Sequence, residues 1–401
     1  MWTARACGVA AMGSFVMNVD GSVDDHVFAL LGKIFKEQKS YEPWLEDLKP
    51  LATVALLRSQ QTIEHRPPEP NAGDVPLHSA EFQGWAQMCI ESHQLWNAIQ
   101  DCHVTAEQLG RYRVLIAPHA ACLSAPQIQT IMTFVRNGGT LIVTGETSLF
   151  DENGRRRSDF GLAEALGVSY LGDLEPDHRF LCLRDKRLRA RETWVLDTLV
   201  YHTGQMAVKT TRPSSVLAVV GDTLPKFIVT NQVMPTDLPG LVRGTYGQGK
   251  VYYFAGLPGQ QYLTFGYHTI RRVVNKILEQ AICQRTPVRL EAPATMELFA
   301  HTQGNSGNLV VNLINNVSGI SRSTGRLCKG SSHMEMTENM PPVAAAELRI
   351  RLARGEKVSR AYLAPGKIPL KCKKYGAEHV IRLTNLGVHT MVVIETRAKK
   401  T

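Results

Sequence analysis

The side chains best suited to catalysis or ligand binding lie at the ends of two apolar runs. Glu146 begins the polar turn after the run at residues 140–143 and Gly145, and His119 ends the run at residues 114–119. Continuous apolar runs of this kind predict buried parallel strands, and open parallel sheets bind ligands beyond the carboxyl ends of their strands. A carboxylate beside an imidazole could transfer protons or orient a polar ligand. We therefore select Glu146 as the candidate catalytic residue, and the candidate ligand-binding residues are His119, Glu146, Thr147 and Ser148.

Two Cys–His pairs have a spacing that could contribute to a metal site. Cys89 and His93 are four residues apart on a predicted helix, and His119 and Cys122 are three apart beyond a predicted strand. The predicted topology separates the pairs, because the first lies on the flank of the sheet and the second at its carboxyl end. We therefore expect no metal and no other cofactor, with Cys89 packed in the core and His93 exposed to solvent.

The bulk composition is that of an ordinary globular protein. Of the 401 residues, 44% are hydrophobic and 20% charged, which suffices for two or three cores of roughly 100–200 residues each. The formal net charge is +9, but no basic run is interleaved with aromatic residues, so we expect no nucleic-acid partner. The eight cysteines include no CxxC pair, which favours reduced thiols in a cytoplasmic protein. No apolar run approaches the roughly 20 residues of a membrane span, so we expect no membrane partner.

The middle of the chain alternates strand and helix patterns. A Ser-x-x-Gln capping box begins one helix at Ser124. Strand, helix, strand order with right-handed crossovers predicts an α/β class, flavodoxin-like parallel sheet. The expected strands lie within residues 53–59, 114–119, 140–143 and 247–259, and the expected helices run from about 80 to 100, from 124 to 137, from 158 onward and from about 263 to 280. Residues 168–245 are β-rich and less regular, and the proline-rich stretch 66–76 predicts a loop.

The last part of the chain, from about residue 287 to 395, loses the helical period. Short alternating runs separated by turns predict strands, and about six to eight of them over roughly 110 residues indicate an antiparallel β-sandwich. The runs are MELFAHT, NLVVNLIN, AELRIRLA, RAYLAP, HVIRLTN and HTMVVIET.

Several phrases of the chain resemble glycoside hydrolases related to the family 42 β-galactosidases. They are LIVTGETSLFDENGRRRSDFGLAEALG at 141–167, GQGKVYYFAG at 247–256, LVVNLINN at 309–316 and YEPWLEDLKPLATVALLRS at 41–59. In that family an amidotransferase-like middle domain, often called the trimerisation domain, precedes a C-terminal β-domain. The resemblance implies a class I glutamine amidotransferase-like domain at 48–285 and the β-sandwich at 286–401.

Residues 1–47 resemble the end of the catalytic (β/α)8 barrel that precedes the middle domain in this family. They contain a strand-like stretch at 14–21 and an amphipathic helix pattern that starts near Val27 and ends near Tyr41. We expect most or all of the barrel to be absent from the chain. The two carboxylates that hydrolyse the glycosidic bond belong to barrel strands in the family. The acids that remain as candidates are Asp20, Asp24, Asp25, Glu146, Asp151, Glu152 and Asp159.

Structural roles compete with the catalytic ones for these acids. Residues 151–154 form a DENG surface-turn motif, and Asp159 would stabilise a helix N-terminus. Glu146 could serve as a structural hydrogen-bonding group. The aromatic side chains near the closing strand could line a sugar-stacking surface or belong to the core, and they are Tyr253, Tyr262, Tyr267 and His268.

Amidotransferases of class I carry their nucleophilic cysteine on a G-x-C-x-G strand-to-helix turn. The equivalent turn here is residues 145–149, where Thr147 replaces the cysteine and the second glycine is missing. Cys122 follows a different strand without flanking glycines, so we expect a packed structural thiol. Amidotransferase activity is therefore not expected.

The resemblance implies a non-catalytic assembly region of a family 42-like glycoside hydrolase, inactive alone, that forms a homo-oligomer, either a trimer or a dimer. One alternative is a β-galactosidase-like glycoside hydrolase, completed by a separate barrel chain or using a new site near Glu146. Another is a small-molecule or sugar sensor that uses the crevice near His119 and Glu146. Carbohydrate is the ligand class that these functions share, and the sequence does not identify the sugar.

Overall fold

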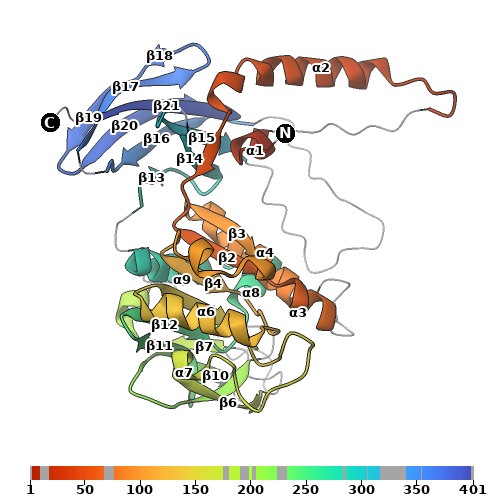
Figure 1. Cartoon of the computed structure of the whole chain (residues 1–401), viewed down its shortest axis with the longest axis vertical. Helices are drawn as coiled ribbons and strands as arrows, with labels where there is room; N and C mark the ends of the chain where they lie inside the picture. The colour runs from red at the N-terminus through yellow and green to blue at the C-terminus, as the bar shows by residue number, and fades with distance from the viewer. Residues whose placement is uncertain are drawn as a thin grey trace.

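The computed structural model describes residues 2–9, 18–66, 76–174, 180–189, 198–200, 205–223, 233–282, 286–304, 306–316, 340–353 and 355–398. Residues 14–17 of the strand predicted at 14–21 and most of the predicted proline-rich loop lie outside these ranges, as do Cys283 and Cys328. Figure 1 shows two layered bodies, an α/β part and a β-sandwich, with one long helix extending from the sandwich side.

The α/β part is built on a nine-stranded sheet in the order β3-β2-β4-β5-β12-β11-β10-β7-β8. Its first five strands are parallel. They are β2 (Val54–Arg58), β3 (Trp96–Gln100), β4 (Val114–Ala117), β5 (Thr140–Thr144) and β12 (Gly249–Phe254). In chain order these strands run 2-1-3-4-5, which is the flavodoxin-like arrangement. The predicted fold class is confirmed.

The sheet continues with antiparallel strands that account for the β-rich stretch. They are β7 (Phe180–Leu183), β8 (Thr198–Val200), β10 (Ser215–Thr223) and β11 (Val233–Tyr246). A separate two-stranded sheet pairs β6 (Val168–Asp173) with β9 (Met206–Thr210).

Helices cover both faces of the parallel strands, and each face has its own core. Successive residues of β2 alternate between the cores: Ala55 and Leu57 pack in one, whereas Val54 and Leu56 pack in the other. This alternation makes each buried strand apolar throughout. The helices are α3 (Gln60–His65), α4 (Leu77–Glu91), α5 (Ala106–Leu109), α6 (Ala125–Arg136), α7 (Ala163–Leu166), α8 (Pro258–Phe265) and α9 (His268–Ile282). The predicted capping box of α6 is present at Ser124.

Three helix predictions were wrong in extent. The helix expected at 80–100 ends at Glu91, because His93 adopts a φ of 53°, and the following residues form edge strand β3. The helix expected at 263–280 is two helices, divided at Gly266 with a φ of 64°. The helix expected from Ser158 is only the four-residue α7.

Asp159 consequently does not occupy a helix N-terminus, which corrects the role predicted for it. Its Oδ1 accepts hydrogen bonds from the backbone N–H groups of Phe160 and Tyr170, at 2.8 and 2.9 Å. The carboxylate thus links the loop after β5 to β6.

The second body is the predicted antiparallel sandwich, in which sheets β1-β14-β15-β21-β17-β18 and β13-β16-β20-β19 enclose one core. Its strands are β1 (Leu48–Pro50), β13 (Val288–Glu291), β14 (Met296–Gln303), β15 (Leu309–Asn315), β16 (Val343–Ile350), β17 (Glu356–Ala364), β18 (Ile368–Pro369), β19 (Cys372–Tyr375), β20 (Glu378–Leu386) and β21 (His389–Ala398). All six predicted runs are strands. β1 pairs with β14, so the chain contributes a strand to the sandwich before it enters the α/β part.

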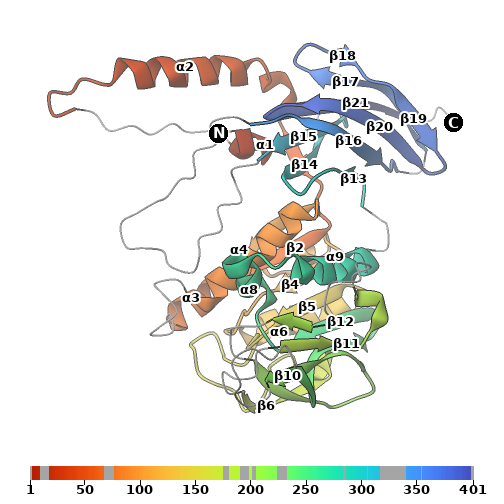
Figure 2. The same ribbon diagram turned by 180° about the vertical axis from the view of Figure 1, so that it is seen from behind.

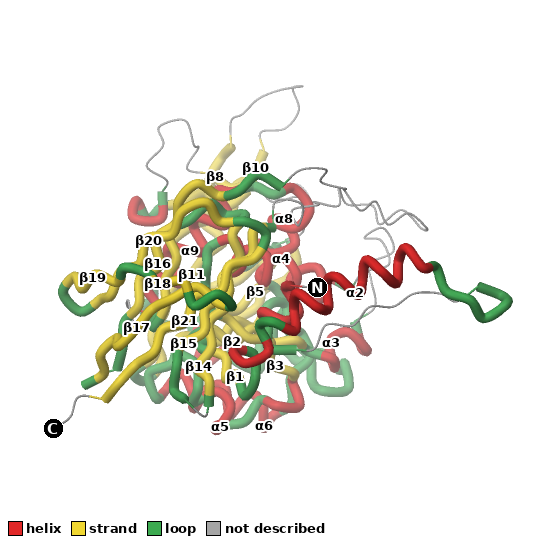
Figure 3. The backbone as a smooth tube through the Cα atoms, turned by 90° about the horizontal axis from the view of Figure 1, so that it is seen from above, coloured by secondary structure: helices red, strands yellow, loops and turns green. Residues whose placement is uncertain are grey.

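The N-terminal part contains α1 (Trp2–Ala6), α2 (Asp25–Lys39) and the single turn Glu42–Trp44. Asp24 caps α2 by accepting hydrogen bonds from two backbone N–H groups. Figures 2 and 3 show α2 projecting from the rest of the molecule. Among the described residues, no helix is long and apolar enough to cross a membrane.

Candidate functional site

Glu146 and His119 meet at the carboxyl ends of the neighbouring parallel strands β5 and β4. The Glu146 Oε2 lies 3.6 Å from the His119 Nε2, and the Glu146 backbone N–H donates to the His119 Nδ1 at 3.4 Å. His119 has a φ of 47°, which turns the chain at the end of β4. The structure therefore brings Glu146 and His119 together, as the sequence predicted.

Arg66, just after α3, completes this cluster. Its Nη2 donates to the Glu146 Oε2 at 2.8 Å, and its guanidinium lies 4.5 Å from the centre of the Phe150 ring. Sequence reasoning missed Arg66, which lies 80 positions before Glu146 and directly before the proline-rich stretch. The position of α3 could have indicated Arg66. This helix follows β2, and β2 is a neighbour of β4 in the sheet.

Burial and charge together set the protonation of this cluster. Burial raises the pKa of Glu146, and the Arg66 guanidinium opposes that rise. Burial, and to a smaller extent the charge of Arg66, lowers the pKa of His119 to about 3. His119 is therefore neutral at physiological pH, and the ion pair of the cluster is Arg66 with Glu146. This arrangement holds the carboxylate in place, since its Oε2 is engaged by the guanidinium.

Thr147 and Ser148 are buried, and their hydroxyls bond to the backbone of adjacent loops. The Thr147 Oγ1 accepts from the Ala120 N–H at 3.1 Å and lies 2.8 Å from the Thr144 carbonyl oxygen, to which it can donate. The Ser148 Oγ accepts from the Leu162 N–H at 3.1 Å. These bonds fix the loop after β5, and a role for either hydroxyl in ligand binding stays a prediction.

The loops beside this cluster are tied by Ser59, His78 and Asp101, which sequence reasoning also missed. The Ser59 N–H donates to the His78 Nε2 at 2.8 Å, so His78 carries its proton on Nδ1, which donates to the Pro118 carbonyl oxygen at 2.7 Å. The Asp101 Oδ2 accepts from the Gln61 N–H at 2.9 Å. Both ring nitrogens of His78 are thus engaged by backbone groups, which leaves neither to activate a nucleophile.

Removing the positive charge of Arg66 tests how the cluster is held. We expect Arg66→Met to lower the free energy of unfolding by about 1–2 kcal/mol at neutral pH, because it leaves the Glu146 carboxylate buried without its partner. Since the folded-state pKa of Glu146 is already raised, the loss should shrink at acidic pH, where Glu146 is protonated.

Chemical denaturation of the wild-type and variant proteins at acidic and neutral pH measures this effect. Arg111→Met is the matched control, because Arg111 pairs with Glu107 on the surface and should contribute less than about 1 kcal/mol. An equal loss at both pH values would contradict the account, and Glu146→Gln in the Arg66→Met background should restore part of the stability.

One comparison with known proteins concerns the α/β part. The sequence profile of the family described as the beta-galactosidase trimerisation domain matches residues 94–281. We call residues 94–281 the trimerisation domain, after the family that they match. No curated protein matches the chain in sequence. The match begins just before β3 and ends in α9, so the trimerisation domain includes Glu146 and His119, whereas Arg66 lies upstream of the matched residues.

Solved structures share the fold over nearly the whole chain. α-L-Fucosidase isoenzyme 2 from Paenibacillus thiaminolyticus is 20% identical with a TM-score of 0.76, over 98% of this chain and 56% of that one. A family 42 β-galactosidase of G. stearothermophilus is 18% identical with a TM-score of 0.62, and the match covers 96% of this chain and 47% of that one. The β-galactosidase from Bacillus circulans sp. alkalophilus is 15% identical with a TM-score of 0.58, and the match covers 94% of this chain and 46% of that one. The chain thus spans about half the length of these proteins.

The cysteines considered for a metal site lie in different cores of the α/β part. Cys89 packs in one core and Cys122 in the other, and burial raises their pKa values to about 12 and about 11. His93 is half-buried rather than exposed as predicted, with its Nε2 3.3 Å from the Pro293 carbonyl oxygen. Within the described ranges, no group of three or more His, Cys, Asp or Glu side chains could hold a metal ion.

The aromatic residues near the end of the trimerisation domain divide into core and surface. Tyr253 and Tyr262 are fully buried, and the Tyr253 hydroxyl donates to the Gly145 carbonyl oxygen at 3.3 Å. Tyr267 is 36% exposed and stacks on Phe265 with ring centres 5.5 Å apart. Tyr253 and Tyr262 therefore have the core role that the sequence allowed, and they do not form a surface on which a sugar could stack.

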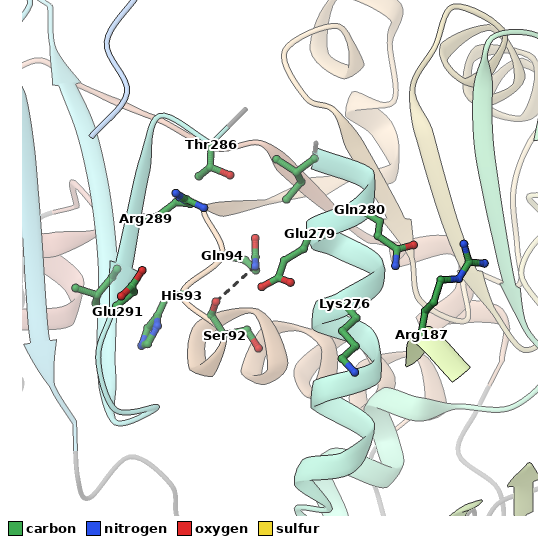
Figure 4. Close-up of a pocket in the computed structure, with 12 residues that line it drawn as sticks. Ser92, His93, Gln94, Arg187, Lys276, Glu279, Gln280, Thr286, Arg289 and Glu291 are labelled. Atoms are coloured by element: carbon green, nitrogen blue, oxygen red, sulfur yellow. Dashed lines mark hydrogen bonds between the residues drawn. The ribbon is translucent and has the colours of Figure 1, made fainter. Parts of the chain in front are cut away.

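A cavity of about 740 Å³ lies between the trimerisation domain and the sandwich. Figure 4 shows polar side chains around it from the end of α4, from α9 and from β13. His93, Lys276 and Glu291 are among its lining residues, and neither Glu146 nor His119 is. The predicted crevice and this cavity are therefore different places in the fold.

Proposed function

We propose that the chain is the assembly region of a family 42-like glycosidase and that it forms a homotrimer through the trimerisation domain. The observation that carries the proposal is the match of residues 94–281 to a family named for trimerisation. The contacts around Glu146 support a non-catalytic role, because Arg66 and backbone groups engage Glu146, Thr147 and Ser148. The division near residue 285 into this domain and the sandwich belongs to the same proposal.

The Phe265–Tyr267 pair is the part of the domain surface that best fits contact with a second copy. Phe265 is 42% exposed and Tyr267 is 36% exposed, and both lie within the matched residues at the junction of α8 and α9. Stacked aromatic side chains bury much apolar area at low conformational cost, and aromatic residues are enriched where protein interfaces concentrate their binding energy. We place this pair in the trimer contact.

The double variant Phe265→Ser and Tyr267→Ser is expected to weaken the trimer. The loss of two interface aromatic side chains should raise the concentration of half-dissociation at least about tenfold. Sedimentation velocity over a range of protein concentrations measures this shift.

The matched control is the double variant Phe28→Ser and Leu30→Ser on α2, outside the matched residues. It should leave the trimer unchanged. A trimer that persists in the aromatic variant and dissociates in the α2 variant would show that the assembly surface is α2 instead.

Helix α2 favours a second candidate function, in which a separate polypeptide supplies the catalytic domain. Its apolar residues fall at helical spacing on one face, yet they are exposed: Val27 41%, Phe28 55%, Leu30 58% and Phe35 40%. An apolar helix face of this kind is typical of an interaction surface. The matched glycosidases continue for about half their length beyond what this chain covers.

Assays of aryl galactosides and aryl fucosides distinguish these functions. The chain alone should give no turnover, and turnover that depends on an added glycosidase chain and on Phe28 and Leu30 would support the second candidate. Turnover by the chain alone that disappears in Glu146→Gln would place a catalytic site at Glu146.

A cytoplasmic location is also part of the proposal, because the described cysteines are free thiols.

A further inference from the structure

A second cavity, of about 320 Å³, lies where three parts of the chain meet. The N-terminal segment contributes Cys7, edge strand β3 contributes Trp96, and β14 contributes Glu297 and His301. Most of the other lining residues are apolar. They include Pro50, Leu51, Ala52, Ile90, Leu95, Leu298, Phe299 and Ala300. A concave, largely apolar site with a few polar groups is the usual form of a small-molecule pocket.

Glu297 and His301 lie on the same face of β14, because side chains alternate along a strand. Both are almost fully buried, with 8% and 3% of their surfaces exposed. The Glu297 Oε1 accepts from the Asn316 Nδ2 at 2.7 Å, but the Glu297 Oε2 and the His301 Nδ1 are buried atoms without a hydrogen-bond partner among the described residues. Buried polar atoms are rarely left unpaired in folded proteins, so each calls for a group that the cavity could admit.

The charge of the cavity is unbalanced as well. Burial raises the pKa of Glu297, and only the hydrogen bond from Asn316 opposes that rise. No Lys or Arg is among the lining residues in the described part of the chain, so an ionised Glu297 has no counter-ion there. A buried carboxylate of this kind is stabilised by a cation that donates hydrogen bonds to it.

His301 requires a different partner. Burial lowers its pKa to about 4, while a hydrogen bond with the Cys7 backbone acts in the opposite sense. The ring is therefore neutral at physiological pH and donates to the backbone through Nε2, which leaves Nδ1 as an acceptor. The backbones of Glu297 and His301 are four residues apart, or about 13 Å along a strand. One small head group cannot satisfy both atoms.

We propose that this cavity binds an elongated, mostly apolar amine that carries a hydrogen-bond donor at its far end. The ammonium group pairs with the Glu297 Oε2, the apolar body lies along Trp96 and the aliphatic lining, and the distal donor reaches the His301 Nδ1. Tyramine has these three features and serves as the probe. Tyrosol replaces the ammonium by a hydroxyl, and phenethylamine lacks the phenolic donor.

Calorimetric titration of the full chain with the three probes tests the proposal at mildly alkaline pH. Tyramine should bind in a saturable manner, and tyrosol should bind at least about tenfold more weakly, because it lacks the charge that pairs with Glu297. Phenethylamine should fall between them. Glu297→Gln should weaken tyramine binding to the level of tyrosol, and Glu356→Gln, an exposed carboxylate on the same sandwich, should bind as the wild type does.

Thermal unfolding separates this binding role from a structural one. The Glu297→Gln variant removes a buried charge without changing the shape of the side chain, so its unfolding temperature should not fall. Equal affinity for tyramine and tyrosol in the wild type, or no saturable binding of tyramine, would overturn the proposal without reference to any variant. The outcome is independent of whether the chain forms a trimer.

Discussion

The Gly84→Ala variant is expected to lose about 3 kcal/mol in its free energy of unfolding. Gly84 lies in α4, where the helix crosses Gly259 of α8. A Cβ atom on Gly84 would lie 1.8 Å from the Gly259 carbonyl oxygen. A Cβ on Gly259 would in turn lie 2.3 Å from the Glu81 carbonyl oxygen. Because both contacts are with backbone atoms, neither can be relieved by a change of rotamer, and the two helices would have to separate.

Chemical denaturation of the purified variants measures this loss, and Gly32→Ala is its matched control. Gly32 is also a glycine inside a helix, α2, but nothing lies within 4 Å of the position of its Cβ. Alanine there should therefore raise stability, by at most about 1 kcal/mol through helix propensity. Equal and small effects of the two substitutions would show that α4 and α8 do not approach as closely as described.

The second large effect concerns Glu81, which is fully buried at the same helix contact. Its Oε1 accepts from the Trp85 Nε1 at 2.8 Å, and its Oε2 accepts from the Gln260 N–H at 2.7 Å. Burial raises the pKa of Glu81 from 4.5 to about 7, against the lowering effect of these hydrogen bonds. In this pH range the folded state therefore binds the proton more tightly than the unfolded state.

The stability contributed by this protonation is fully present below the unfolded-state pKa and is lost as the pH rises through the folded-state value. The free energy of unfolding should consequently fall by roughly 3 kcal/mol between about pH 4.5 and 7. Glu81→Gln should remove this part of the pH dependence, whereas Glu107→Gln, an exposed carboxylate, should keep it. Unfolding curves collected across the range measure both, and a variant profile parallel to that of the wild type would contradict the assignment.

The architecture could be predicted from the sequence because burial on both sheet faces leaves a distinctive pattern. Strands β2, β4 and β5 are continuous apolar runs, and the sandwich strands alternate. Strand β3 could not be found in the same way, since it is an edge strand and Trp96 continues the apparent helical spacing of α4. The helix boundary depends on the positive φ of His93, which residue type does not indicate.

The site shows the same division between local and long-range information. The meeting of Glu146 and His119 could be predicted because both follow neighbouring parallel strands, whose carboxyl ends share one edge. The role of Arg66 depends on how the loop after β2 folds back over that edge. The unpaired atoms of Glu297 and His301 depend on the contact between the sandwich and the N-terminal segment, which no local pattern specifies.

The central claim is that the chain assembles through its trimerisation domain, and the mass of the purified 401-residue chain in solution tests it most directly. Light scattering coupled to size-exclusion chromatography should give three times the 44.4 kDa mass of one chain, with no glycosidase turnover in the collected peak. A mass of one chain at all accessible concentrations would contradict the assembly function.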